Sequence, residues 1–357
     1  MKVSDIPGDI LKRFREGCVI PALPLALSAD GAFDPRSERA ILRYYSDAGA
    51  GGVAVGVHST QFAIRDVPGF LGELLRFASE TLDRWPRPDG SSLMKIAGIC
   101  GDTGQALEEA ALAVEAGYHA GLLSLTAFRD LGYPEMLRHA RAVAETVPVI
   151  GFYLQPAVGG RVLPYEFWKD FASIDNVLGV KIAPFSRYGT LDVVRGVVDS
   201  PRAGEVTLYT GNDDTIVADL ITPFRIVDAG GVPRTVRIAG GLLGHWGVWT
   251  ASAVKLLGRL KDLVSRGADI PPDVLSLARA ITDMNAAVFD AANGFSGCIP
   301  GIHEILHRQG LTDSPRCLDP EETLSPGQSE ELDRVCAAYP DLVDDDFVRK
   351  SLLRWRT

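Results

Sequence analysis

Short apolar runs alternate with longer amphipathic segments along most of the chain. The runs are rich in valine, isoleucine, leucine and alanine, which is typical of strands buried on both faces. The longer segments repeat apolar residues at helical spacing, and proline or glycine marks many of their ends. We expect strands at 19–27, 52–57, 95–99, 121–125, 147–153, 177–182, 206–209 and 247–250. We expect helices at 35–48, 68–84, 103–116, 134–146, 164–174, 189–198 and 215–220, with a further helix from about 251.

Eight such strand–helix pairs predict an α/β fold, a closed (β/α)8 TIM barrel with a C-terminal helical extension. No glycine-rich dinucleotide fingerprint follows the first expected strand, which disfavours an open sheet. We expect residues 1–263 to form the barrel catalytic domain and residues 264–357 to form a helical region packed on it. Between the last two barrel units, 224–238 predicts a β-hairpin that turns around Asp228-Ala229-Gly230-Gly231.

Composition and charge narrow the function classes. The chain has 357 residues and a formal net charge of −10, and it lacks a basic run, which argues against nucleic acid as a partner. No apolar run is long enough to cross a membrane, and the first residues lack a signal core. The five cysteines are scattered and odd in number, which favours reduced thiols over a disulfide framework. We therefore expect a cytoplasmic protein.

One lysine stands inside a buried strand, where a charge is costly. Lys181 lies in the apolar run 177–182, and Tyr153 ends the preceding expected strand at the same edge of the sheet. Burial without a carboxylate partner should lower the pKa of the lysine and make its neutral amine accessible. A neutral amine within reach of a phenol hydroxyl suits Schiff-base chemistry on a carbonyl substrate. The alternative is that Lys181 extends from a strand end to solvent and that Tyr153 is a packed aromatic residue.

Active sites of such barrels lie at the C-terminal ends of the strands. That rule selects polar and aromatic residues that follow or end the expected strands, and taken singly each of them could instead bond within its own turn. We expect substrate-binding residues among His58, Ser59, Thr60, Gln155, Asn212 and Trp249, with Thr126, Phe128, Asp213 and Thr250 in the same ring.

Two motifs in this ring resemble those of a known family. Gly151-Phe152-Tyr153-Leu154-Gln155-Pro156 is similar to a Tyr-Asn-x-Pro motif, and Gly179-Val180-Lys181 is similar to a Gly-x-Lys motif. Together they resemble the dihydrodipicolinate synthase and N-acetylneuraminate lyase family of Schiff-base barrels, and the 28-residue separation of Tyr153 and Lys181 also fits.

The resemblance implies a class I aldolase-type lyase. Lys181 would form the covalent imine and Tyr153 would shuttle protons, so no metal and no organic cofactor would be needed. The substrate would be a small 2-oxo acid such as pyruvate, with an aldehyde as a second substrate. The resemblance also implies a homodimer or homotetramer.

Several residues depart from the family pattern. Val57-His58 replaces a pair of threonines that hold the keto-acid carboxylate, and Val158 stands in place of an arginine, with Arg161 three residues further on. A second relay tyrosine is absent near Phe128. We therefore expect a poor dihydrodipicolinate synthase that accepts a different aldehyde or a dehydratable sugar acid. A dehydratase-type or non-catalytic member of the same barrel family stays open.

A competing motif lies in the C-terminal region. His303-Glu304-Ile305-Leu306-His307 has the form H-E-x-x-H, whose histidines share one helix face and can bind zinc in hydrolases. Pro300-Gly301 stands just upstream, and no methionine follows Met284, so the turn typical of one such protease class is missing. We expect an ordinary C-terminal helix here and no metal site.

Overall fold

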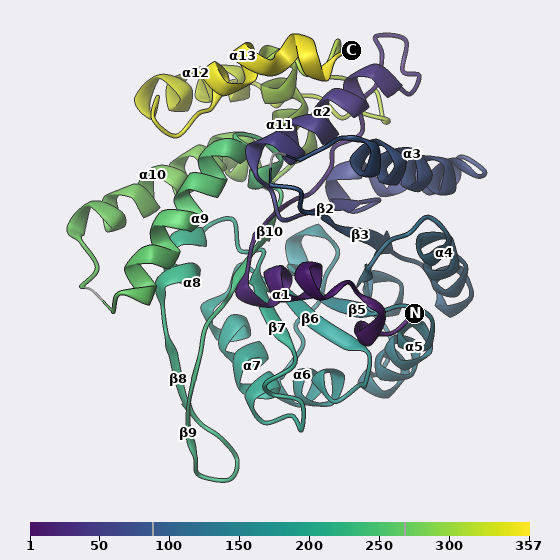
Figure 1. The fold of residues 1–357 in the computed structure, drawn as a ribbon, viewed down its shortest axis with the longest axis vertical. Helices are drawn as coiled ribbons and strands as arrows, with labels where there is room; N and C mark the ends of the chain where they lie inside the picture. Colours follow the sequence, from purple (N-terminus) through teal and green to yellow (C-terminus); the bar gives the residue numbers. More distant parts are fainter. Residues whose placement is uncertain (88, 268) are drawn as a thin grey trace.

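Eight parallel strands form one sheet that curls into a barrel, with helices on its outer side (Figure 1). The computed structural model describes residues 1–87, 89–267 and 269–357. The sheet order is β1-β10-β7-β6-β5-β4-β3-β2, and an isolated parallel bridge between Ala22 and Ala54 joins its two edges. The predicted (β/α)8 barrel is confirmed. Its strands are β1 (Val19–Pro21), β2 (Gly52–Val55), β3 (Met94–Ile99), β4 (Ala120–Leu123), β5 (Val149–Leu154), β6 (Val177–Ala183), β7 (Thr207–Thr210) and β10 (Gly240–Leu243).

Helices connect the strands and cover the barrel wall. Asp34 caps the first of the connecting helices, because its carboxylate accepts the backbone N–H groups of Arg36 and Ser37 at 3.0 and 3.2 Å. Pro35 then occupies the first helical position, where its missing N–H costs nothing. The helices around the barrel are α2 (Pro35–Ala48), α3 (Phe70–Arg84), α4 (Thr103–Glu115), α5 (Tyr133–Thr146), α6 (Tyr165–Ala172), α7 (Arg187–Val198), α8 (Ile216–Ile221) and α9 (Thr250–Ser265).

A helix that the sequence pattern did not reveal precedes the first strand. In α1 (Gly8–Glu16), Ile10 and Phe14 are buried against side chains from the barrel interior. The ring of Phe14 stacks on Tyr209 of β7 with 4.6 Å between centroids. This helix therefore closes the end of the barrel at which the strands begin.

The expected hairpin is present outside the barrel wall. Strands β8 (Phe224–Val227) and β9 (Pro233–Val236) pair antiparallel in a sheet of their own. The Asp228 carboxylate accepts the N–H groups of Gly230 and Val232 at 3.0 and 2.8 Å, which holds the turn. The hairpin projects at the end of the molecule opposite α12 and α13 (Figure 1).

The last barrel strand lies earlier in the chain than expected. It spans Gly240–Leu243, so the prediction of a strand at 247–250 was wrong. A Cβ on Gly240 would lie 2.5 Å from the carbonyl oxygen of Cys18, and one on Gly241 would lie 2.5 Å from the ring of Trp246. The close approach of neighbouring chain thus requires these glycines, although glycine is unfavourable in a strand pattern.

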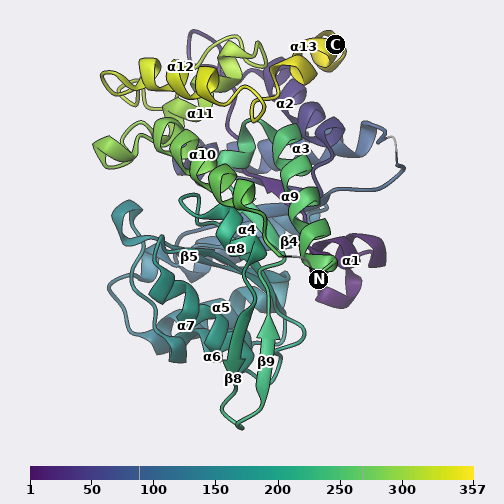
Figure 2. The same cartoon turned by 90° about the vertical axis from the view of Figure 1, so that its left-hand side faces the viewer.

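Four further helices follow the barrel: α10 (Pro272–Val288), α11 (Cys298–Arg308), α12 (Gln328–Ala338) and α13 (Asp345–Trp355). Helices α11–α13 gather at one end of the molecule in both views (Figure 2). Trp355 of α13 packs on Tyr44 of α2, whose hydroxyl donates to Asp344 at 2.7 Å. The division at residue 263 into two domains stays a prediction. No helix in the described ranges is long and apolar enough to span a membrane.

Candidate active site

A pocket opens where the barrel strands end, and the C-terminal extension forms part of its wall. It encloses about 620 Å³ of space between atoms, including space open to solvent. Loops after β2, β5, β6, β7 and β10 contribute to it, as do the segment after α10 and the first turns of α11. The lining residues are Ala22, Val57, His58, Ser59, Phe152, Leu154, Gln155, Val158, Lys181, Ala183, Phe185, Gly211, Asp213, Gly244, Phe289, Phe295, Cys298 and Ile302.

Lys181 extends from β6 into this pocket. Its stem lies against Gly211, where a Cβ would come within 2.7 Å of the lysine Cε. Its Nζ sits 4.3 Å from the centroid of the Phe152 ring. Within the described part of the chain, Nζ makes no hydrogen bond or ion pair with a side chain. Burial lowers the pKa of the ammonium well below that of free lysine, and the nearby Asp213 carboxylate opposes that shift. The amine can therefore lose its proton near neutral pH.

Asp213 is the acidic group of the pocket. It follows β7 in the loop that leads to α8, and its Oδ1 accepts the backbone N–H of His245 at 3.1 Å. Its backbone carbonyl accepts the side-chain amide of Asn285 from α10. Burial raises the pKa of this carboxyl well above its usual range. A carboxyl and an amine that both change charge near neutral pH thus line the same pocket.

Tyr153 does not face Lys181, which corrects the sequence-based expectation. The β5–β6 ladder begins with Val149 opposite Val177, but after a register shift Ile150 lies opposite Gly179. An extra residue in β6 therefore places Lys181 opposite Phe152 and Tyr153 opposite Ile182.

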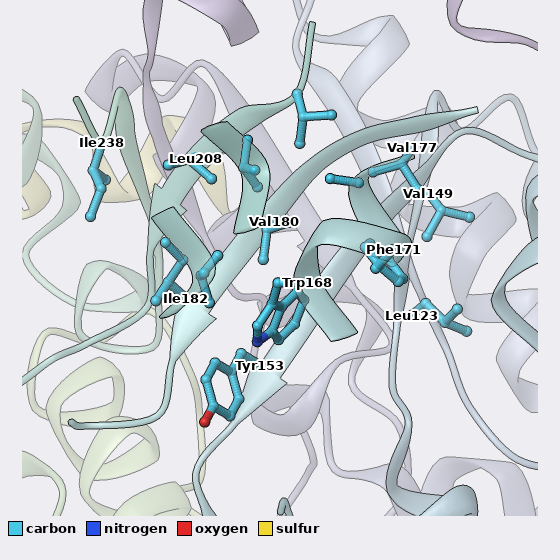
Figure 3. Close-up of a cluster of buried hydrophobic side chains, with 14 of the residues drawn as sticks. Leu123, Val149, Tyr153, Trp168, Phe171, Val177, Val180, Ile182, Leu208 and Ile238 are labelled. Atoms are coloured by element: carbon cyan, nitrogen blue, oxygen red, sulfur yellow. The ribbon is translucent and has the colours of Figure 1, made fainter. Parts of the chain in front are cut away.

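Alternate residues of a strand point to opposite faces, so this shift turns Tyr153 away from the pocket. Its ring packs on Trp168 of α6 in the layer between strands and helices (Figure 3). Its hydroxyl accepts the backbone N–H of Leu163 at 3.2 Å. The expected placement of the Tyr153 hydroxyl beside the amine is therefore wrong, and the phenyl ring of Phe152 occupies the position that faces the amine.

Three of the expected substrate-binding residues do line the pocket, namely His58, Ser59 and Gln155. Burial, together with the charge of Lys181, lowers the pKa of His58 to about 4, so its imidazole is neutral at neutral pH. The Ser59 hydroxyl and the Gln155 amide add neutral hydrogen-bonding groups. What these side chains bind stays a prediction.

The other three expected residues lie outside the pocket, which is a second correction. The Thr60 hydroxyl donates to the carbonyl oxygen of Leu23 at 2.7 Å and accepts the N–H of Gly56 at 3.0 Å, so it braces the loop after β2. Asn212 is fully buried, and its amide donates to Asp219 at 2.9 Å.

Trp249 belongs to a core cluster between barrel and extension, because residues 247–250 form the turn before α9 and the start of that helix instead of the expected strand. It is the N-cap residue of that helix, with a left-handed backbone φ of +50°.

The pocket residues of the C-terminal extension had no signal in the sequence. Phe289, Phe295, Cys298 and Ile302 lie more than a hundred residues after Lys181, and each resembles an ordinary core residue of a helical segment. Only the packing of the extension over the strand ends brings them to the site. Asp213, in contrast, follows from the strand-end rule.

The H-E-x-x-H segment lies within α11, where Nδ1 of each histidine and the carboxylate of Glu304 contact other groups of the same chain. His303 Nδ1 is 3.1 Å from the carbonyl oxygen of Arg316, and His307 Nδ1 is 3.1 Å from that of Thr312. Glu304 pairs with Arg308 at 2.7 Å. In the residues that the structure describes, no cluster of three or more histidine, cysteine, aspartate or glutamate side chains has the arrangement of a metal site. These contacts favour the structural interpretation of the segment.

Comparisons with known proteins identify the fold. No family model and no curated protein sequence matches the chain. Solved structures do match over nearly their whole length. The fold is that of dihydrodipicolinate synthases and N-acetylneuraminate lyases. Dihydrodipicolinate synthase from Oceanobacillus iheyensis superposes with a TM-score of 0.69 at 14% identity, covering 93% of this chain and 99% of that one.

Two further neighbours were solved with pyruvate. N-acetylneuraminate lyase from Fusobacterium nucleatum complexed with pyruvate has a TM-score of 0.68 at 16% identity, covering 91% of this chain and 97% of that one. A prophage protein of the dihydrodipicolinic acid synthase family from E. coli K12, also in complex with pyruvate, has a TM-score of 0.68 at 18% identity, with the same coverage. The resemblance expected from the motifs therefore extends to the whole fold.

Proposed function

We propose that this protein is a Schiff-base-forming lyase that acts on a 2-oxo acid of the pyruvate type, with Lys181 as the nucleophile. The observation that carries the proposal is a buried amine with a lowered pKa, open to a pocket at the strand ends and without an ion-pair partner in the described structure. Burial favours the neutral, nucleophilic form of a lysine. Two structural neighbours with the same fold hold pyruvate, which supports the substrate class.

The reaction needs only groups that the pocket offers. The Lys181 amine attacks the keto carbon, and one water leaves as the imine forms. Loss of a proton from the adjacent carbon gives an enamine, for which the imine nitrogen is the electron sink. Since Tyr153 faces away, we assign the proton transfers to Asp213, whose raised pKa suits a group that gains and loses a proton near neutral pH. No metal or organic cofactor is part of this proposal.

The substrate differs from that of a dihydrodipicolinate synthase. Val57 and Val158 line the pocket where hydroxyl and guanidinium donors were expected. Arg161 lies outside the lining of this pocket, and its Nη1 donates to the carbonyl oxygens of Arg129 and Leu131 at 2.8 and 2.7 Å. We expect negligible condensation of pyruvate with aspartate semialdehyde, measured in a coupled assay.

A second candidate is a barrel that binds a keto acid without turnover. It is favoured by one observation, the phenyl ring of Phe152 at the position that faces the amine. Assembly as a homodimer or homotetramer, and a cytoplasmic location, stay predictions.

Borohydride trapping tests the proposal. The protein is incubated with pyruvate and borohydride, and peptides are analysed by mass spectrometry. We expect one reduced adduct on Lys181 and none in Lys181→Ala. Lys95 is an internal control, because it is also buried but its Nζ is held by Asp83 at 2.8 Å. Labelling of Lys95 and Lys181 alike, or of neither, would contradict the proposal. An adduct without turnover on any aldehyde would favour the binding barrel.

A further inference from the structure

Three phenylalanine side chains form one wall of the pocket, together with an isoleucine. Phe185 comes from the loop after β6, and Phe289 and Phe295 come from the segment after α10. The rings of Phe185 and Phe295 meet edge to face with 5.9 Å between centroids. Ile302 of α11 completes the wall. Aromatic pairs of this geometry have their own attraction beyond the area they bury, and an edge-to-face ring is a good partner for another ring.

Two of these phenylalanines adopt a backbone conformation that is unfavourable for them. Phe185 has φ of +51° and Phe295 has φ of +71°, values that glycine adopts freely and bulky residues rarely do. Such strain persists only where the surroundings impose it, and it clusters at binding sites. Asn212 fixes the first position, since its Oδ1 accepts the Phe185 N–H at 3.0 Å. Both strained residues present their rings to the same pocket.

The segment that carries Phe289 and Phe295 is braced on its far side. Gln328 of α12 donates to the carbonyl oxygens of Val288 and Gly297 at 3.2 and 2.9 Å. The Asp290 carboxylate accepts the Gly297 N–H at 3.0 Å. On the near side, Gly244 makes room for the Phe289 ring, because a Cβ there would lie 2.9 Å from it. The wall is therefore held in place before any ligand binds.

Few groups in the pocket could hydrogen-bond a sugar chain. The neutral polar side chains that line it are Ser59, Gln155 and the uncharged His58. The Thr60 hydroxyl is engaged by the backbone. A polyhydroxylated substrate would leave several hydroxyls without partners, and burying an unpaired hydroxyl is unfavourable. An apolar group would instead gain from burial.

We propose that the second substrate of this site carries an aromatic or similarly bulky apolar group, which Phe185, Phe289, Phe295 and Ile302 enclose. The inference rests on the Schiff-base function proposed above. Of the two substrate types expected from the sequence, it favours an aldehyde over a sugar acid. The aldehyde is apolar and is the second substrate when the enzyme forms the carbon–carbon bond.

The step balances without a further reactant. The enamine carbon formed on Lys181 attacks the aldehyde carbon, and the aldehyde oxygen takes up one proton as the carbon–carbon bond forms. One water then hydrolyses the imine, which restores the lysine and releases a 4-hydroxy-2-oxo acid. Cleavage is the reverse of these steps. The aryl group is bonded to the aldehyde carbon, and in the pocket it lies against the phenylalanine wall.

Paired aldehydes test the inference. Wild-type protein is given pyruvate with benzaldehyde or with glyceraldehyde, and the 4-hydroxy-2-oxo acid is quantified by mass spectrometry. We expect kcat/KM for benzaldehyde to exceed that for glyceraldehyde by about 10-fold or more, the usual worth of an apolar pocket contact. Phe295→Ala should remove most of that preference, and Phe295→Leu should retain part of it.

Tyr188→Ala is the matched control, because Tyr188 is an aromatic residue 85% exposed on α7 and outside the pocket lining. Borohydride trapping with pyruvate alone, run on every variant, separates the two proposals. A normal adduct on Lys181 together with a preference for glyceraldehyde, or an unchanged preference in Phe295→Ala, would overturn the apolar substrate and leave the Schiff-base function standing. Loss of the adduct in the wild type would overturn both.

Discussion

At the residue scale, the chemistry depends on how Lys181 and Asp213 share charge inside one pocket. Burial disfavours the charged form of each, while each charge favours the other. The ammonium pKa falls and the carboxyl pKa rises, so both groups can change charge near neutral pH. Strongly perturbed pKa values in a cleft are typical of groups that do acid–base work.

Asp213→Asn separates the hydrogen bond that this carboxyl accepts from its charge and its proposed acid–base function. Asparagine keeps the oxygen that accepts the His245 N–H, so the loop should hold its shape. Removal of the negative charge should lower the Lys181 pKa further, and the pH profile of borohydride trapping should move to lower pH. Turnover should fall by about 10²-fold or more, the usual worth of a positioned acid–base group. Asp214→Asn is the neighbouring control, since Asp214 lies outside the pocket lining. Trapping that moves to higher pH in Asp213→Asn would contradict this assignment.

Tyr153→Phe distinguishes the observed register from the expected one. The hydroxyl accepts a single backbone N–H, that of Leu163. Its removal should cost about 1–3 kcal/mol of stability, because a buried donor loses its partner. Turnover should stay at the wild-type value in the folded enzyme, and chemical denaturation with parallel kinetics measures both. A 100-fold loss of kcat in a stable variant, about the effect of removing a general acid, would mean that the hydroxyl reaches the reacting atoms.

The error over Tyr153 has a definite physical origin. Strands of a parallel barrel are apolar on both faces, so the hydrophobic pattern alone does not tell which of the two alternating sets of side chains faces the barrel interior. The 28-residue spacing of Tyr153 and Lys181 matches the register at the start of the β5–β6 ladder, where Val149 lies opposite Val177. One extra residue in β6 then flips every later side chain relative to that register. Composition and spacing contain no trace of such a bulge.

At the scale of elements, the alternation of apolar runs and amphipathic segments predicted most strands and helices of the barrel. The exceptions lie where tertiary packing overrides the hydrophobic pattern. Strand β10 begins with Gly240 and Gly241, which strand propensity argues against and close neighbours require. The run that includes Val248 has a strand-like composition, but it forms the turn between η6 (His245–Gly247) and α9. The rule that active-site residues lie at strand ends predicted that Lys181 and Asp213 would lie near each other, and both line the pocket. The same rule misplaced Trp249, because the last strand was expected too late in the chain.

Gln328→Ala tests whether the brace behind the phenylalanine wall matters for binding. Its amide donates to three buried carbonyls, those of Ala287, Val288 and Gly297. We expect a loss of about 1–3 kcal/mol in unfolding free energy from the unpaired carbonyls. We also expect a raised KM for an aromatic aldehyde with unchanged trapping of pyruvate. Gln105→Ala, which removes a half-buried bond to Glu109 outside the pocket lining, is the control. Equal KM values in Gln328→Ala and wild type would show that the wall needs no such support.

At the scale of the whole molecule, one end of the barrel is filled by a helix and the other end holds the pocket. Helix α1 fills the end where strands begin, with Phe14 stacked on Tyr209 and the Tyr209 hydroxyl donating to the Phe14 carbonyl oxygen at 2.8 Å. The C-terminal helices cover the opposite end and supply Phe289, Phe295 and Ile302 to the pocket. The extension is therefore part of the candidate active site, and its removal should abolish the site even if the barrel folded alone.

The stability of the whole fold should depend on pH in part through a carboxyl outside the pocket lining. Glu38 of α2 is fully buried, and its Oε2 accepts the N–H of Ala26 at 2.7 Å. Within the described structure its Oε1 has no partner. Burial raises the pKa of this carboxyl from 4.5 to about 8. The folded protein thus keeps a proton that the unfolded chain releases.

Between pH 4.5 and about 8, the unfolded state binds fewer protons than the folded state at this position, so stability falls as pH rises. The contribution of one group is about 1.4 kcal/mol per pH unit within that window. Glu38→Gln keeps an oxygen for the Ala26 N–H and cannot ionise, so the free energy of unfolding should lose that share of its pH slope. The variant should accordingly gain stability relative to wild type as pH rises from 5 towards 8. Denaturant titrations at several pH values measure the slope, with Glu80→Gln as control because Glu80 is exposed. Identical slopes in Glu38→Gln and wild type would show that Glu38 ionises alike in the folded and unfolded chains.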